Sequence, residues 1–213
     1  FYAGPGLALD VGGPEALAAG GANPEELAAF LQFCGCSALI TNGTAPAGWR
    51  ADGHLYGFAL AAGAQLPEPA ADEALWAALA LDTAPPAGEL AAFLYPAGPQ
   101  RDDYYSALCT KRVRGLARVW ALRQGGVLAA TIGAYAIRDG RAYLACGCTA
   151  EPLRGRGAGG RLAVRFANAL AGQGLEVCLL CRGERTGFYT RLGFAPAGAL
   201  ARYTNETGKE SYA

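Results

Sequence analysis

A glycine-rich turn between a strand-like run and a helix-like run most limits how this chain can fold. The turn, Thr149–Gly160, reads TAEPLRGRGAGG and holds four glycines and two arginines. Arg141–Cys148 (RAYLACGC) precedes it, and the helix-like Arg161–Gly172 (RLAVRFANALAG) follows it. Glycine lets backbone N–H groups crowd around a ligand, and a helix start adds unpaired N–H groups and a positive dipole end. The turn therefore predicts an anion site suited to phosphate or pyrophosphate.

Two well-known phosphate motifs fit the turn poorly. Gly155-x-Gly157-x-x-Gly160 matches the dinucleotide fingerprint, which expects an acidic residue at the end of the next strand. The next strand-like run, Leu175–Cys181, carries its only acid, Glu176, near its start. A nucleotide P-loop needs Gly-Lys-Ser/Thr, and the turn contains no lysine.

A third pattern agrees better in order and spacing. Arg154-x-x-Gly157-x-Gly159 follows a strand and leads into a helix, a strand, a short helix and Tyr-x-x-x-Gly-Phe at Tyr189–Phe194. This arrangement resembles the GNAT (general N-acetyltransferase) superfamily over roughly Gly88–Tyr203. The resemblance implies an α/β (α+β) fold with a mixed, mostly antiparallel sheet flanked by helices. The two strands on either side of the crossover helix would run parallel and splay around the cofactor.

The resemblance implies acetyl-coenzyme A as cosubstrate and no metal. The turn would cradle the pyrophosphate, while backbone N–H groups at the end of the preceding strand would hold the pantetheine and the thioester oxygen. The residues expected to contact the cofactor are Gly147, Cys148, Thr149, Arg154, Gly155, Arg156, Gly157, Ala158, Gly159 and Gly160.

Tyr189 matches the family's tyrosine and is the candidate acid for the departing thiolate, because a phenol with a pKa near 10 stays protonated at neutral pH. Its alternative role is packing. No base is convincing: the candidates are Glu151, Glu184, Asp102 and Asp103, and each is more often a solvated carboxylate. Arg182 stands where the family often has an asparagine. Two functions follow: an N-acetyltransferase using direct attack by an amine, or a GNAT-like module that binds coenzyme A or acyl-coenzyme A without turnover.

The best linker is Asp82–Gly88 (DTAPPAG), which divides the chain into residues 1–82 and a GNAT-like domain at 83–213. The strand–helix–strand–loop–strand order of the first part echoes the second and suggests a degenerate GNAT-like half; an unrelated α/β extension is the alternative. Its expected elements are Gly6–Val11, Asn23–Phe33, Ser37–Thr41 and His54–Ala62. Helices are expected at Ala71–Leu81, Glu89–Tyr95 and Arg101–Lys111. The first strand of the GNAT pattern is not evident, and His54–Ala62 is a candidate for it.

Charge and composition narrow the partners. Lys+Arg and Asp+Glu both total 18, which disfavours a broad nucleic-acid or anionic-membrane surface. No apolar run reaches the roughly 18 residues of a membrane span, and no secretion signal opens the chain. Seven cysteines, mostly inside apolar runs, favour reduced core thiols and a cytoplasmic setting. The expected acceptor is a small-molecule or peptide amine, and a homodimer is left open.

Overall fold

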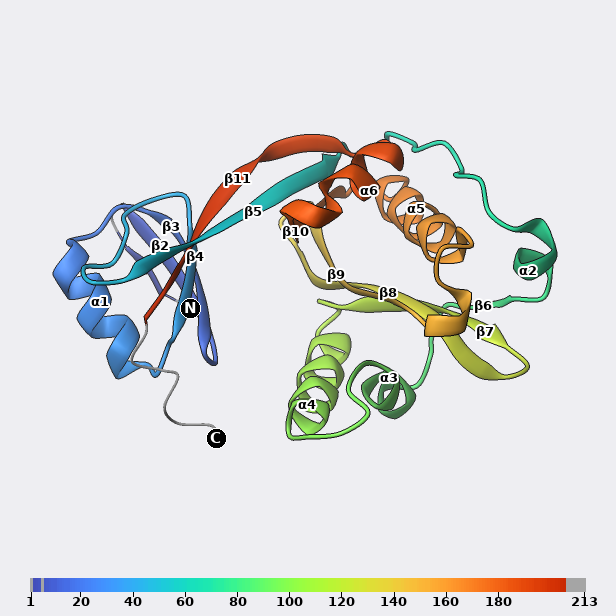
Figure 1. Ribbon diagram of the computed structural model, residues 1–213, viewed down its shortest axis with the longest axis horizontal. Helices are drawn as coiled ribbons and strands as arrows, with labels where there is room; N and C mark the ends of the chain where they lie inside the picture. The colour runs from blue at the N-terminus through green and yellow to red at the C-terminus, as the bar shows by residue number, and fades with distance from the viewer. Residues whose placement is uncertain (1, 5, 206–213) are drawn as a thin grey trace. The chain divides into compact units, whose positions relative to one another are not determined.

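The computed structural model describes residues 2–4 and 6–205 (Figure 1). Packing divides the chain into two compact units. The first comprises residues 1–57, 181–186 and 197–213, and the second comprises Phe58–Leu180 and Gly187–Pro196. The chain therefore passes between the units more than once. The division of the sequence at 82/83 stays a prediction about its domains.

The first unit is a sheet with one helix packed on it. The strand order is β1-β2-β3-β4-β11-β5. The strands β1, β2 and β3 pair antiparallel, β3 and β4 pair parallel through α1, and β11 pairs antiparallel with β4. Its elements are β1 (Tyr2–Gly4), β2 (Leu7–Gly12), β3 (Glu15–Gly20), α1 (Pro24–Phe33), β4 (Ala38–Thr41), β5 (Arg50–Leu60) and β11 (Ala195–Thr204).

Helix α1 begins where the sequence predicts. Asn23 accepts hydrogen bonds from the N–H groups of Glu25 and Glu26, both at 3.0 Å. Pro24 occupies the first helical position, where a missing N–H costs nothing. Leu27 and Leu31 then face the sheet and pack into a core with residues of β2, β3 and β4.

The second unit is a mixed sheet with helices on both faces. The strand order is β5-β10-β9-β8-β7-β6. Strands β6 to β9 pair antiparallel, and β10 pairs parallel with β9. Its elements are α2 (Glu73–Ala77), β6 (Ala80–Asp82), α3 (Ala87–Leu94), α4 (Gln100–Val113), β7 (Arg118–Gln124), β8 (Val127–Arg138), β9 (Arg141–Thr149), η1 (Glu151–Leu153), α5 (Ala158–Ala171), β10 (Glu176–Arg182) and α6 (Thr186–Arg191). The short helix η2 (Gly183–Arg185) belongs to the first unit.

Alternating side chains of β7 show how the two faces are filled. Val119 and Ala121 pack with Leu90 of α3 and Leu108 of α4. Trp120, between them, points to the other face, where its ring lies 5.2 Å from that of Phe166 on α5. Figure 1 shows α5 on one side of these strands and α3 and α4 on the other. This arrangement confirms the expected mixed, mostly antiparallel sheet flanked by helices.

The order of elements in the two units repeats. In each unit three antiparallel strands are followed by a crossover helix and by a fourth strand parallel to the third. The first series is β1-β2-β3-α1-β4 and the second is β7-β8-β9-α5-β10. The echo read from the sequence therefore has a topological counterpart, while a GNAT-like origin of the first half stays a prediction.

Two expectations for the middle of the chain were wrong. The helix expected over Ala71–Leu81 is only α2, Glu73–Ala77, and it is followed by the strand β6. This strand, not His54–Ala62, pairs with β7 and supplies the missing first strand of the pattern. A three-residue strand is too short to show an alternating pattern, so its alanine-rich surroundings resemble a helix.

No helix among residues 2–4 and 6–205 is long and apolar enough to cross a membrane.

Candidate functional site

The parallel strands β9 and β10 separate near the glycine-rich turn. Their pairing runs from Arg141 opposite Glu176 to Leu144 opposite Leu179. Strand β9 then continues to Thr149, beyond its last residue paired with β10. Half of the N–H and C=O groups in this last stretch point to the side that β10 has left. An extended group can hydrogen-bond to this exposed strand edge, as expected for a splayed pair.

A β-bulge interrupts β9 in this same stretch. Thr131 of β8 lies opposite Cys148, but Gly133 lies opposite Ala145, so β9 carries one extra residue. Cys146 has φ +53°, a left-handed conformation that non-glycine residues rarely adopt. Its carbonyl oxygen accepts a hydrogen bond from the hydroxyl of buried Thr131 at 3.2 Å. The bulge redirects the backbone where the strands separate.

The helix α5 starts behind this edge without a cap of its own. Gly157 is the N-cap residue with φ +82°, no side chain caps the helix, and its first turn holds no acid. The space at Gly159 is filled by Thr149, since a Cβ there would lie 2.4 Å from the Thr149 hydroxyl oxygen. Side chains that would compete with an anion are thus missing from this helix start.

The corresponding helix of the first unit differs in each of these respects. Helix α1 has the Asn23 side chain across its first N–H groups, and Glu25 and Glu26 in its first turn. The Asn23 side chain occupies N–H groups that an anion would otherwise bind, and the two carboxylates would repel an anion. Of these two crossover helices, only α5 has a start suited to a phosphate group.

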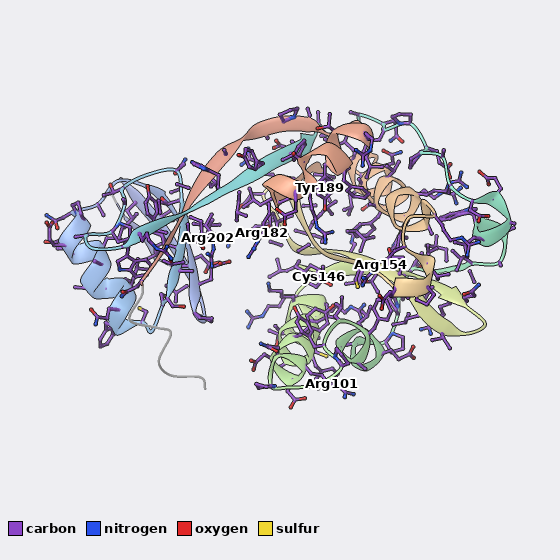
Figure 2. The ribbon with its side chains drawn as sticks, in the orientation of Figure 1. Arg101, Cys146, Arg154, Arg182, Tyr189 and Arg202 are labelled. Atoms are coloured by element: carbon purple, nitrogen blue, oxygen red, sulfur yellow. The ribbon has the colours of Figure 1, made fainter. Side chains whose placement is uncertain are left out.

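The two arginines of the turn point to different partners. The Nε of Arg154 donates to the carbonyl oxygen of Thr149 at 3.0 Å, which keeps this exposed side chain near the end of β9 (Figure 2). The guanidinium of Arg156 forms an ion pair with Asp72 at 2.6 Å, and the Arg156 carbonyl accepts from the Asp72 N–H at 3.0 Å. The Arg156 side chain is therefore paired with Asp72 at the start of α2, while the Arg154 side chain lies near the end of β9.

The comparisons with known proteins agree with this geometry. The family model of the acetyltransferase (GNAT) family matches residues 87–194. The chain belongs to the GNAT family. No curated protein sequence gives a significant match.

Solved GNAT structures resemble the chain in fold. A GCN5-related N-acetyltransferase from Kribbella flavida has a TM-score of 0.60 at 16% identity and covers 95% of this chain and 90% of its own. One from Sphaerobacter thermophilus has a TM-score of 0.63 at 16% identity, covering 94% and 76%. A tandem GNAT protein from the clavulanic acid biosynthesis pathway has a TM-score of 0.59 at 14% identity, covering 96% and 84%. At these identities the likeness concerns the fold.

The predicted GNAT site residues other than Tyr189 lie in two adjoining segments of the second unit. Gly147, Cys148 and Thr149 form the end of β9 that lies beyond its pairing with β10, and residues 154–160 form the turn and the start of α5. A Cβ at Gly160 would lie 3.3 Å from the Leu192 side chain and 3.7 Å from Phe188, so α6 packs against the start of α5. This contact places the helix that carries Tyr189 beside the turn.

Tyr189 itself lies among aromatic rings. The centroid of its ring is 5.8 Å from that of Phe58, 5.1 Å from Phe188 and 5.9 Å from Phe194. The side chain is half-buried, and Figure 2 shows it on α6. These contacts account for a packing role, and they also hold the ring in one position for an acid role. The four candidate bases, Glu151, Glu184, Asp102 and Asp103, are all exposed.

Sequence reasoning missed the segment that braces the GNAT turn from outside. Residues 65–73, here called the strap, run along α5. The Asn168 side chain on α5 accepts from the N–H of Leu66 at 2.8 Å and donates to its C=O at 2.9 Å. At the other end, a Cβ on Gly157 would lie 2.6 Å from the carbonyl oxygen of Ala70. The strap therefore contacts both the helix and the turn.

Charged pairs bind the strap along its length. Arg161, whose side chain is 9% exposed, donates to both carboxylate oxygens of Glu73 at 3.0 and 2.6 Å and lies 5.0 Å over the Trp76 ring. Arg165 pairs with Glu68 at 2.6 Å. The sequence itself shows only that acidic residues stand before and at the start of α2 and that arginines stand on α5. Nothing local shows that side chains about 90 positions apart would pair.

Proposed function

We propose that this protein is an N-acetyltransferase that transfers an acetyl group from acetyl-coenzyme A to an amine acceptor by direct attack. The observation that carries the proposal is the uncapped start of α5 directly behind the parted end of β9. One element suits a pyrophosphate and the other suits an extended amide chain, which are successive parts of coenzyme A. Family membership supports the same reading.

The residues present fit the cosubstrate. The N–H groups of Ala158, Gly159 and Gly160 at the start of α5 would hold the pyrophosphate, with the Gly155–Gly157 backbone around it. Arg154 supplies the nearby positive charge. The edge of β9 at Gly147, Cys148 and Thr149 would pair with the pantetheine amides. Because Arg156 is held by Asp72, its contribution is to shape the turn as much as to bind phosphate.

Bound acetyl-coenzyme A would supply an activated thioester. The protein would place the acyl carbon and stabilise the thioester oxygen, on which negative charge develops. It would also provide a proton for the departing thiolate and a route for the proton that the amine loses. Backbone N–H groups at the β9 bulge would stabilise that oxygen, since preorganised donors cost no reorganisation during reaction. Tyr189 would give a proton to the departing thiolate. A water chain would take the proton of the amine, because the candidate carboxylates are exposed.

A second function has one observation in its favour. The missing base and the aromatic packing of Tyr189 would suit a module that binds coenzyme A or acyl-coenzyme A without turnover. Calorimetry with acetyl-coenzyme A tests both functions, and no binding at high micromolar concentration would reject both. Turnover across a panel of amines, corrected for hydrolysis, then separates enzyme from module. A binding protein that acetylates none of the amines would reject the transferase.

We also propose that the first half of the chain is a degenerate GNAT-like half. The repeated order of elements and the coverage of a tandem GNAT protein over 96% of this chain support it. Because α1 is capped by Asn23, we expect one coenzyme A per chain, bound at α5. Calorimetric stoichiometry checks this expectation. A small-molecule or peptide acceptor, a homodimer and a cytoplasmic location stay predictions.

A further inference from the structure

Asp72 holds the Arg156 guanidinium by one side only. Nε and Nη2 of Arg156 both donate to the same carboxylate oxygen, Oδ2 of Asp72, at 3.1 and 2.6 Å. Within residues 2–4 and 6–205, Nη1 of Arg156 has no hydrogen-bond or ion-pair partner. Because a guanidinium presents its N–H groups in a rigid fork, fixing the Nε side also fixes the direction of the Nη1 side.

Asp72 is itself held in place. Its Oδ1 accepts a hydrogen bond from the N–H of Leu75 at 2.9 Å and so caps α2. Its own N–H donates to the carbonyl oxygen of Arg156 at 3.0 Å. The Leu75 N–H and then the Arg156 guanidinium lower the pKa of Asp72, so the carboxylate is charged at pH 7. Asp72 therefore holds both the backbone and the side chain of Arg156.

The next residue of the strap ties this arrangement to α5. Both oxygens of Glu73 accept from Nη1 and Nη2 of Arg161, and Nε of Arg161 donates to the Pro69 carbonyl oxygen at 3.3 Å. All three nitrogens of this nearly buried guanidinium are thus engaged, unlike those of Arg156. Arg161 serves to fix the strap, whereas Arg156 keeps one side for a further partner.

Arg156 stands where such a partner is expected. It immediately precedes Gly157, the N-cap residue of α5, so it adjoins the N–H groups that would hold the pyrophosphate. A half-exposed arginine without a fixed partner samples many rotamers and loses that freedom on binding, whereas one that is already held loses less. An aspartate that instead withheld Arg156 from the phosphate would weaken binding, so removing the carboxylate distinguishes the two roles.

We propose that Asp72 is a positioning residue of the pyrophosphate site: it holds Arg156 by the Nε side and so presents the Nη1 side to the pyrophosphate of coenzyme A. This inference rests on the use of coenzyme A in the proposed function. Asp72 does not touch the cofactor; it acts through Arg156.

The test is a double-mutant cycle read by calorimetry with coenzyme A. Asp72→Asn and Asp72→Ser both keep an oxygen for the cap of α2 and remove the charge. We expect each to lower the affinity for coenzyme A about fivefold, the size of one partly exposed ion pair. In the Arg156→Gln background, Asp72→Asn should change the affinity by less than about twofold. Measurements at about 0.15 M salt screen the repulsion between exposed charges and phosphate.

Glu68 provides a matched control on the same strap. It holds Arg165 as Asp72 holds Arg156: Nε and Nη2 of Arg165 lie 2.9 and 2.6 Å from one carboxylate oxygen. The Arg165 guanidinium, however, lies over the Trp76 ring, 4.8 Å from its centroid, and belongs to a later turn of α5. Glu68→Gln therefore removes the same charge and should leave the affinity for coenzyme A within about twofold of the wild type.

A kinetic readout separates positioning from general damage. Because the pyrophosphate is bound alike in the ground state and in the transition state, Asp72→Asn should raise KM for acetyl-coenzyme A about fivefold and leave kcat within about twofold. Tighter or unchanged binding in Asp72→Asn, an equal loss in the Arg156→Gln background, or an equal loss in Glu68→Gln would overturn the inference. A wild type that binds coenzyme A but acetylates no amine would reject the transferase, and the calorimetric cycle would still decide the role of Asp72. A wild type that binds no coenzyme A would reject both.

Discussion

Gly155 and Gly157 form a matched pair that measures how the strap holds the phosphate turn. Their φ angles are similar, +75° and +82°. A Cβ on Gly155 meets nothing within 4 Å, whereas one on Gly157 would lie 2.6 Å from the Ala70 carbonyl oxygen and 2.7 Å from the Ala71 Cα. Substituting alanine at each site therefore adds the same backbone strain but very different crowding.

The expected magnitudes follow from these two terms. A left-handed alanine costs about 1–2 kcal/mol relative to glycine, and this applies to both variants. Crowding of well-packed atoms adds about 1–3 kcal/mol at Gly157 only, because the strap backbone must move. We therefore expect Gly155→Ala to lower the free energy of unfolding by about 1–2 kcal/mol and Gly157→Ala by about 2–5 kcal/mol.

Urea denaturation at pH 7 measures both values, with the slope checked for a change in the denatured state. Calorimetry with acetyl-coenzyme A on the folded variants then tests whether a displaced strap also weakens cofactor binding, which we expect for Gly157→Ala more than for Gly155→Ala. Equal stability losses, within about 0.5 kcal/mol, would show that the strap does not press on the turn and would refute the reasoning.

Three further predictions follow from single contacts. Asn168→Ala should lower the free energy of unfolding by about 2–3 kcal/mol, because it removes both hydrogen bonds to the buried Leu66 backbone; thermal and urea unfolding would measure it, and a loss below about 0.5 kcal/mol would contradict it. Tyr189→Phe should slow the chemical step about 10²–10⁴-fold in single turnover and leave donor affinity unchanged; a rate within about twofold of wild type would leave Tyr189 as a packing residue. Burial raises the pKa of Tyr104 to about 12 and raises that of the Cys146 thiol above its usual 9.0, so the folded state retains protons that the unfolded state loses. The free energy of unfolding should therefore fall between about pH 9 and 12. In the double variant Tyr104→Phe, Cys146→Ala this fall with pH should be shallower, and a fall as steep as in the wild type would count against these groups.

Features governed by neighbouring residues were read from the sequence. Asn23, Pro24 and the two acids after them start α1 because capping involves only residues two or three positions apart. The glycine-rich turn is likewise a local signal, and it led to the family, to the start of α5 and to the parted strands around the candidate site.

Contacts between distant positions were decided by the tertiary structure. Arg156 was expected at the phosphate but is paired with Asp72, 84 positions away, and no spacing rule links the two. Strand β11 pairs with β4 although its sequence, APAGALARYT, is rich in alanine and also holds a proline and a glycine, all of which have little strand propensity. Cys146 adopts a left-handed conformation in a bulge although it is not a glycine, and the hydroxyl of Thr131 on β8 donates a hydrogen bond to its carbonyl oxygen. Capping and turn formation depend on a few adjacent residues, whereas ion pairs, strand neighbours and strained backbone depend on what packing brings together.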